Sequence, residues 1–261
     1  MQNPCDLSGQ TAVVTGSSSG IGRAIALELA AAGADVLVHA RHSSQAARRV
    51  ADEIVGLGRA AQVVMLDLVD HAAHSALVAA ACEWRPQIDI WINNAGVDLL
   101  TGAAAGLTFE EKLEQAWRVD VLATIRLSRL IGARMQAQGK GVILNLGWDQ
   151  ADHGMAGDSG ELFAATKGAV MSFSKSLAMS LAPQVRVNCL APGWIKTSWG
   201  ETASEYWQRR AVREAQLGRW GTPEDVARVA LFAVSPAAGF LTGQTLDVNG
   251  GLLFRNERPQ P

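Results

Sequence analysis

Short apolar runs alternate with longer segments of helical pattern along most of the chain. The apolar runs have the length and composition of strands that are buried on both faces of a parallel sheet. We predict strands at Thr11–Val14, Asp35–Ala40, Ala61–Leu66, Ile88–Asn93, Val142–Leu146, Val185–Leu190 and Thr245–Val248. We predict helices at Ile21–Ala32, Ser44–Gly56, Ala72–Glu83, Glu110–Gln138, Glu161–Leu181 and Pro223–Ala233.

This alternation predicts an α/β fold, a doubly wound parallel sheet with helices on both faces and therefore three layers. The chain shows no internal repeat or linker, so residues 1–261 are expected to form a single domain. The least regular stretches are Trp148–Gly160 and Trp194–Trp220. Because loops after the carboxyl ends of strands hold the ligand in such folds, we expect the site chemistry there.

Composition restricts the partners of the chain. A content of 48% hydrophobic residues allows a large core, and a formal net charge of -2 gives no reason to expect nucleic acid or an anionic membrane surface. The three cysteines have no spacing typical of a disulfide framework or a zinc site, so no metal is predicted. Neither an export signal nor an apolar run of membrane-spanning length is evident. We expect a cytoplasmic protein whose partner is a small molecule.

A glycine-rich turn between the first strand and the first helix is the clearest candidate site. Glycines there let the backbone approach a pyrophosphate held at the helix N-terminus. The alternative is a tight turn without a ligand, but the strand-turn-helix context favours a dinucleotide. The expected contacts from this segment, Thr15–Gly22, are Gly16, Ser18, Ser19, Gly20, Ile21 and Gly22.

The end of the second predicted strand bears on the choice of cofactor. An acidic residue there would bind the adenosine ribose hydroxyls and repel a 2′-phosphate. This chain has Ala40 followed by Arg41, with His42 and Ser43 as further donors. NADP(H) is therefore predicted in preference to NAD(H), the alternative being that Arg41 is an ordinary solvated residue.

Several motifs in order resemble the short-chain dehydrogenase/reductase family. They are the glycine turn, Asn93-Asn94-Ala95-Gly96, Pro192-Gly193-Trp194-Ile195-Lys196-Thr197, the segment Gly218–Val226, and Asn249-Gly250-Gly251. Within that family the layout looks like 3-oxoacyl-acyl carrier protein reductases and sugar or polyol dehydrogenases. The resemblance implies a Rossmann-type sheet of seven strands in the order 3-2-1-4-5-6-7. It also implies a homo-oligomer, either a dimer or a tetramer.

The resemblance further implies positions for the cofactor. Asp67 and Leu68 would lie near the adenine, and Asn93, Ala95 and Gly96 beside the ribose. The Pro192-Gly193 pair with Ile195 and Thr197 would lie near the nicotinamide. Each residue could instead be structural, with Asn93 bonding at a strand end and Pro192-Gly193 forming a turn.

Three of the four catalytic positions that the family implies are changed. The family uses Asn, Ser, Tyr and Lys, where Tyr transfers the proton, Ser holds the substrate oxygen, and Lys assists Tyr and binds the ribose. Counted from the motifs, this chain has Asp120, Trp148, Phe163 and Lys167 at those positions. General acid catalysis contributes about 100- to 10,000-fold, so its loss would cripple the usual mechanism without preventing cofactor binding. Lys167 would then bind the ribose, paired to Asp120.

A substitute acid could come from the irregular stretches. His153 is the best single candidate because the pKa of histidine lies near neutrality, and Tyr206 lies in the loop expected to close over the pocket. Each of these side chains could also be ordinary solvated loop polarity. As a set they favour a polar substrate; the others are Asp149, Asp152, Asp158, Ser159 and Glu161.

Three functions fit these residues. The first is an NADP(H)-dependent oxidoreductase for a small polar carbonyl or alcohol, with non-standard proton transfer. The second is a catalytically silent or non-redox protein that keeps the dinucleotide as a structural or sensor ligand, which Phe163, Trp148 and Asp120 favour. A third is an epimerase or lyase in which the cofactor is reduced and reoxidised in one cycle, for which the sequence offers no specific support.

Overall fold

A seven-stranded sheet forms the centre of the structure, a computed structural model that describes residues 3–252. All neighbouring strands are parallel, and their order is β3-β2-β1-β4-β5-β6-β7, which confirms the expected topology. The strands are β1 (Thr11–Val14), β2 (Asp35–Ala40), β3 (Ala61–Met65), β4 (Ile90–Asn93), β5 (Gly141–Leu146), β6 (Val185–Pro192) and β7 (Thr245–Val248).

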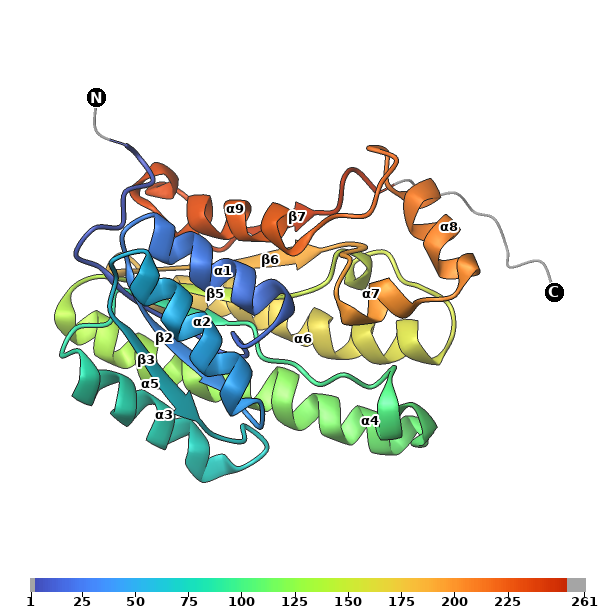
Figure 1. The fold of residues 1–261 in the computed structure, drawn as a ribbon, viewed down its shortest axis with the longest axis horizontal. Coiled ribbons are helices and arrows are strands. Elements are labelled where there is room, and N and C mark those ends of the chain that lie inside the picture. Colours follow the sequence, from blue (N-terminus) through green and yellow to red (C-terminus); the bar gives the residue numbers. More distant parts are fainter. Residues whose placement is uncertain (1–2, 253–261) are drawn as a thin grey trace.

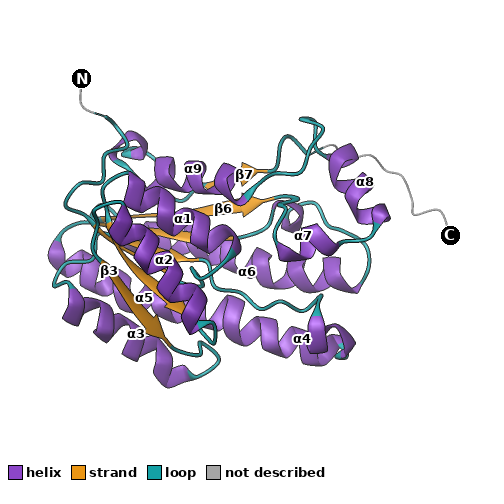
Figure 2. Ribbon diagram, in the orientation of Figure 1, coloured by secondary structure: helices purple, strands orange, loops and turns teal. Residues whose placement is uncertain are grey.

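Helices cover both faces of the sheet (Figures 1 and 2). One face carries α1 (Gly20–Ala31), α2 (Ser44–Gly56) and α9 (Pro223–Val234), whose apolar residues form a shared core with the strands. The opposite face carries α3 (His71–Trp84), α5 (Thr124–Gln138) and α6 (Asp158–Leu181), with a second core beneath them. The strands are apolar on both faces because each face packs against helices.

The order of the strands reverses between β1 and β4, which are neighbours although most of two βα units separate them in sequence. The loops that leave these two strands diverge at their carboxyl ends and open a crevice there, the place where doubly wound folds bind ligands. The glycine turn follows β1, and the Asn93–Gly96 segment follows β4. Two distant parts of the chain thus meet at one site.

The helical stretch predicted as Glu110–Gln138 is interrupted. It consists of α4 (Phe109–Ala116), a wider π-helical segment at Trp117–Ala123, and α5. Such local widening is frequent at functional sites. The buried Asp120 lies in this segment. Short 3₁₀ segments occur at Gly102–Gly106, Asp149–Ala151 and Pro236–Ala238.

The stretch Trp194–Trp220, expected to be irregular, contains two helices, so that prediction is wrong. They are α7 (Ser198–Thr202) and α8 (Glu205–Glu214). At 5 and 10 residues they are too short to give a clear apolar period. Figure 1 shows α7 and α8 beyond the end of β6, at the same end of the sheet as α4. Within residues 3–252, no helix combines the length and apolarity needed to cross a bilayer.

Candidate functional site

The glycine turn after β1 is held by hydrogen bonds to β2. The Gly16 N–H donates to His39 Nδ1 at 3.1 Å, and the Ser17 N–H donates to the His39 carbonyl at 2.9 Å. The other ring nitrogen of His39 lies 3.1 Å from the Leu66 carbonyl oxygen. A donating Nε2–H and an accepting Nδ1 satisfy both bonds, so the ring is neutral. Burial lowers the pKa of His39 to about 4, which favours this neutral form.

Glycine is required in this turn by close backbone contacts. Gly16 has a φ of 64°, and a Cβ on it would lie 2.8 Å from the Ala95 Cα. A Cβ on Gly22 would lie 2.3 Å from the Gly16 carbonyl oxygen. The side-chain amide of Asn94 donates to the carbonyls of Thr15 and Gly16 at 2.9 and 3.2 Å. The turn is thus fixed by its neighbours rather than by a ligand.

A cleft of about 470 Å³ opens beside this turn. It gathers most residues predicted to hold the adenosine half of a dinucleotide: Gly16, Ser18, Ser19, Arg41, Asp67, Leu68, Ala95 and Gly96. His42 and Ser43 line it too, and the Arg41 Nε lies 4.0 Å from Asp67 Oδ2. The glycine cradle, the helix N-terminus and this cleft together fit a dinucleotide.

Asn93, predicted to lie beside the ribose or to bond at a strand end, has its side chain inside the protein. Asn93 is 4% exposed, and its side-chain amide donates to Ser128 Oγ and Asn145 Oδ1, both at 2.8 Å. The oxygen of the same side-chain amide, Oδ1, accepts the Trp91 indole N–H at 2.9 Å. All these bonds lie inside the protein, so Asn93 joins strands. The next residue, Asn94, lines the cleft instead.

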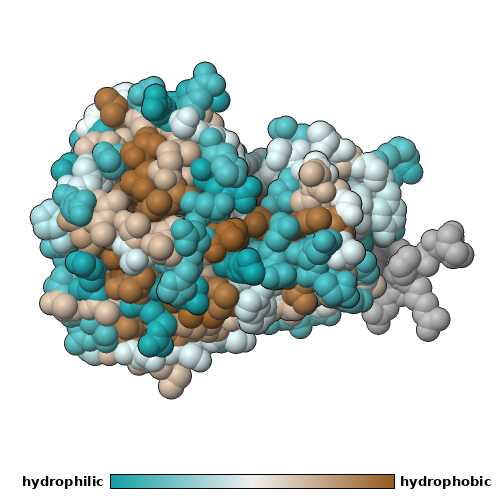
Figure 3. Space-filling view, turned by 90° about the horizontal axis from the view of Figure 1, so that it is seen from below, coloured by the Kyte–Doolittle hydropathy of each residue, from teal (hydrophilic) through white to brown (hydrophobic). Residues whose placement is uncertain are grey.

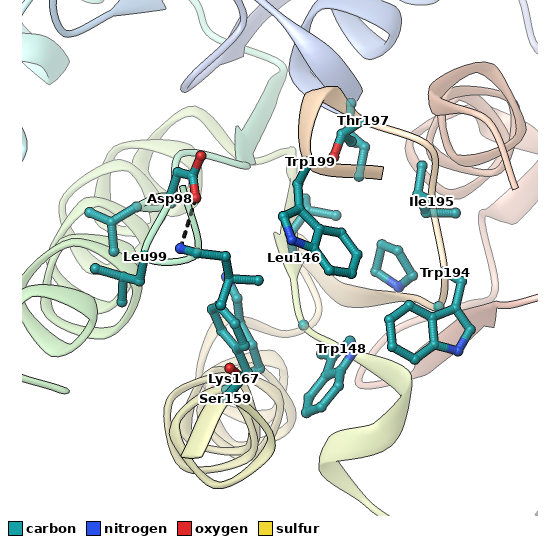
Figure 4. Close-up of a pocket in the computed structure, with 18 of the residues that line it drawn as sticks. Asp98, Leu99, Leu146, Trp148, Ser159, Lys167, Trp194, Ile195, Thr197 and Trp199 are labelled. Carbon is teal, nitrogen blue, oxygen red and sulfur yellow. Dashed lines mark hydrogen bonds between the residues drawn. The ribbon is translucent and has the colours of Figure 1, made fainter. Parts of the chain in front are cut away.

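A second cavity, of about 620 Å³, shares Asn94, Gly96, Val97 and Asp98 with the first. Figure 4 shows labelled residues from β5, α6, α7 and the loop after β6 converging around it. The predicted site residues that it brings together are Ile21, Trp148, Phe163, Lys167, Pro192, Gly193, Ile195 and Thr197. The shared wall makes the two cavities one extended site.

Lys167 and Asp120 form an ion pair at the cavity wall. The Lys167 Nζ lies 3.0 Å from Asp120 Oδ2, and their side chains are 16% and 2% exposed. The other carboxylate oxygen of Asp120 accepts the Val97 N–H at 3.1 Å. Lys167 lines the cavity, whereas Asp120 lies behind it. This pairing agrees with the expectation from the sequence.

Phe163 and Trp148 fill neighbouring parts of the same wall. Their rings contact edge to face, with centroids 6.1 Å apart. Neither side chain carries a hydroxyl group. The only hydroxyls that the described residues contribute to the cavity wall come from Ser159, Thr197 and Ser198.

The acids proposed as substitutes do not line the cavity, apart from Ser159. Tyr206 is 54% exposed and packs edge to face on Trp207, while His153 lies on an exposed turn. Asp152, Asp158 and Glu161 are also exposed. Asp152 lies in the loop before α6 and the other two in the first turn of α6, and all three are exposed to solvent, so the basis for a polar substrate is lost.

Asp149 is buried beneath the site. Its Oδ2 would lie 2.9 Å from a Cβ on Gly193, and burial raises the pKa of its carboxyl to about 7. The glycine separates this acid from the cavity, and Asp149 does not line it. Asp149 therefore supports the wall rather than facing a substrate.

Sequence reasoning missed much of the wall. The cavity is also lined by Leu99, Leu100, Leu146, Met155, Trp194, Trp199 and Trp207. The unusual content of 8 Trp, three of them in Trp194–Trp207, was the available signal. Among residues 3–252, no group of three or more His, Cys, Asp or Glu is arranged to hold a metal ion.

A doubly wound parallel sheet, with a glycine turn and cleft at its topological switch point, defines a dinucleotide-binding protein of the Rossmann type. Residues 16–253 match the family model described as Enoyl-(Acyl carrier protein) reductase. The chain belongs to the short-chain dehydrogenase/reductase family.

Curated relatives and solved structures agree with this assignment. The chain is 36% identical over 251 residues to 3-oxoacyl-[acyl-carrier-protein] reductase of Aquifex aeolicus, covering 94% of this chain and 98% of the relative. It resembles the structure of a 7α-hydroxysteroid dehydrogenase complexed with NADH and 7-oxo glycochenodeoxycholic acid, with a TM-score of 0.88 and 32% identity over 97% of this chain and 98% of that one. A gluconate 5-dehydrogenase from Burkholderia cenocepacia, in complex with NADP and tartrate, has a TM-score of 0.85 and 29% identity, covering 95% and 97%.

Proposed function

We propose that this protein is an NADP(H)-dependent oxidoreductase that interconverts a carbonyl and an alcohol, with Lys167 as the proton donor. The observation that carries the proposal is the Lys167 ammonium in the cavity wall, 3.0 Å from Asp120, where the family's tyrosine is replaced by Phe163. The relatives named above are oxidoreductases, which supports the same class.

Arg41 supports the choice of NADP(H). It lines the adenosine cleft beside His42 and Ser43, and its guanidinium is partly exposed. A 2′-phosphate there would accept charge-assisted hydrogen bonds from Arg41, and no acidic residue stands at the end of β2 to repel it. Asp67 is the nearest carboxylate, and it lies on the Nε side of Arg41.

The chemistry divides between cofactor and protein. NADP(H), held by the glycine turn and the adenosine cleft, would supply the hydride chemistry when bound. The Lys167 ammonium donates a proton to the carbonyl oxygen as negative charge develops on it, and the resulting amine is reprotonated from water. Asp120 holds the ammonium in place through a buried carboxylate that also accepts the Val97 N–H. Reversal of these steps oxidises the alcohol.

The test begins with binding. Purified protein is titrated with NADPH and NADH by fluorescence, and the complex is then assayed against a panel of carbonyl compounds. We expect tighter binding of NADPH and measurable turnover. The variant Lys167→Met should lose turnover by at least about 100-fold, the lower limit of a general acid contribution. The control Lys175→Met replaces another lysine of α6 outside the cavity and should retain activity.

A second function has its own support. The edge-to-face contact of Phe163 and Trp148 places two apolar rings where the family has its two hydroxyls, which favours a silent protein that binds the dinucleotide without turnover. The binding and turnover assays of the unmodified protein separate the two cases. Turnover by the unmodified protein supports the oxidoreductase, whereas binding without turnover supports the silent protein. Failure to bind either nucleotide contradicts both.

We also propose a homo-oligomer. Met179 on α6 is 83% exposed and Leu130 on α5 is 40% exposed, so these helices present apolar side chains to solvent. Figure 3 shows brown hydrophobic patches among hydrophilic atoms on the face seen from below. Equilibrium sedimentation should give a dimer or a tetramer, and a monomer at micromolar concentration would contradict the proposal. The cytoplasmic location stays a prediction.

A further inference from the structure

Four tryptophans form one wall of the larger cavity. Trp148, Trp194, Trp199 and Trp207 all line it, and each is only partly buried. Figure 4 shows the first three directed around the same space. Trp220, which does not line the cavity, is 9% exposed behind them. These four residues thus present aromatic surface to the cavity. We call these four residues the tryptophan wall.

The tryptophan wall is fixed in place by polar contacts from outside the cavity. The Trp194 indole N–H donates to Glu214 Oε2 at 2.8 Å. Glu214 Oε1 accepts a hydrogen bond from Arg210 Nε at 2.7 Å. The Arg210 guanidinium lies 5.0 Å from the centroid of Trp207 and 5.6 Å from that of Trp194. The rings are therefore positioned before any ligand arrives.

The rings also contact one another. Trp199 stacks on Trp194 with centroids 6.2 Å apart and meets Trp207 edge to face at 6.0 Å. Such a surface offers both ring faces and ring edges, the two geometries in which aromatic pairs attract each other. A saturated ring of the same shape would gain burial but not these contacts.

The charges around the cavity indicate a neutral ligand. Arg210 already supplies a cation to two rings of the tryptophan wall. The ionisable groups among the described lining residues are Asp98 and Lys167. Asp98 accepts the N–H groups of Leu100 and Thr101, and Lys167 is paired with Asp120. An anionic ligand therefore finds no unpaired cation among these lining residues, and a cationic ligand on the tryptophan rings would be repelled by Arg210.

We propose that the substrate carries its carbonyl or alcohol on a neutral, planar aromatic ring system that packs against the tryptophan wall. The substrate class rests on the proposed function, whereas the recognition of the ring does not. The cavity of about 620 Å³ is large enough for a fused bicyclic ring. Two aromatic contacts correspond to about a tenfold preference over a saturated ring of the same skeleton.

The test compares acetylnaphthalene with acetyldecalin, its saturated counterpart. Binding of each to the protein saturated with NADP⁺, and to the protein alone, is measured by calorimetry. We expect acetylnaphthalene to bind at least about tenfold more tightly in one of these states. Equal affinities, or tighter binding of the saturated ketone, would overturn the proposal.

Variants locate the preference. Trp207→Leu should reduce it to about twofold or less, and Trp207→Phe should retain part of it. Trp84→Leu, at the end of α3 and outside the cavity, is the matched control and should leave it unchanged. Melting curves show whether the variants fold. If Trp207→Leu does not fold, the partial loss of preference in Trp207→Phe decides the test.

Turnover is measured separately. A preference for the aromatic ketone without its reduction would refute the oxidoreductase and leave the recognition of the ring supported. If Trp207→Leu and Trp84→Leu keep the same preference for the aromatic ketone, the tryptophan wall does not cause it and the proposal is overturned.

Discussion

Removing the carboxylate of Asp120 should leave the ammonium of Lys167 buried without a partner. The two groups are 3.0 Å apart, and Asp120 is almost completely buried. Breaking a buried ion pair from one side costs about 3–5 kcal/mol of unfolding free energy, because the remaining charge is not compensated. Lys167 reaches the cavity and can be partly hydrated there. For Asp120→Leu we therefore expect the lower end of that range, about 3 kcal/mol.

Two further variants separate the charge from the hydrogen bond. Asp120→Asn keeps an acceptor for the Val97 N–H and loses only the ion pair, so we expect a cost of about 2 kcal/mol. The double variant Asp120→Leu with Lys167→Met replaces both charges by apolar groups. Its unfolding free energy should lie within about 1 kcal/mol of the unmodified protein, because no unpaired charge remains.

Urea unfolding at one protein concentration and pH 7 measures the unmodified protein, these variants and Lys167→Met, which leaves the buried Asp120 unpaired and should also cost about 3 kcal/mol. The double-mutant cycle should then give a coupling of about 5 kcal/mol. A coupling below about 0.5 kcal/mol would show that the ion pair contributes little to the fold, and the argument from its burial would then be refuted.

Three other changes test separate parts of the structure. Arg41→Asp should weaken NADPH binding about 10- to 100-fold and spare NADH, whereas equal weakening in a fluorescence titration would contradict a 2′-phosphate contact. The pKa of His39 is about 4 when folded against 6.5 when unfolded, so the unfolded state binds the extra proton and the unfolding free energy should fall by about 3 kcal/mol from pH 6.5 to 4. Urea titrations of His39→Gln should show a flatter dependence over that range. The pKa of Asp149 is raised to about 7 from 3.8, so its charged form opposes folding as pH rises through that window. At pH 8, Asp149→Asn should then be more stable than the unmodified protein by about 1–4 kcal/mol. An unchanged or lower urea midpoint would contradict a raised pKa of the Asp149 carboxyl.

The sheet was predictable because its central strands are buried on both sides. Continuous apolar runs such as Val36–Val38 leave few alternatives, and the predicted ends of β1, β2 and β7 agree with the structure. The helices α7 and α8 were not predictable from periodicity. Their sequences hold Trp199 and Trp207 of the tryptophan wall. The contacts that order the two helices, such as Trp199 with Trp220 and Glu214 with Trp194, join residues that only the fold brings near.

The cofactor side of the site followed from the sequence better than the substrate side. The glycine turn has strict backbone demands that any sequence must meet with glycine, and Gly16 and Gly22 meet them. Neighbouring residues at a strand end point to opposite faces. A difference of one position therefore decides whether a side chain enters the core, as that of Asn93 does, or reaches the cleft. His153 was misplaced because the direction of a loop side chain depends on the path of the loop, which no periodicity records.

The three departures from the family's catalytic group that the sequence motifs imply would be physically linked. With Phe163 in place of a tyrosine, Lys167 has no phenol to assist and would be left as an isolated cation beside apolar rings. An asparagine at position 120 could not neutralise it, whereas Asp120 does so at 3.0 Å. Trp148 then fills, with Phe163, the space that two hydroxyl-bearing residues would have left open to solvent. Restoring the family's residue at one of the three positions would leave the other two positions unable to work with it. In a Phe163→Tyr variant, for example, the new hydroxyl would lie beside a lysine that Asp120 already binds.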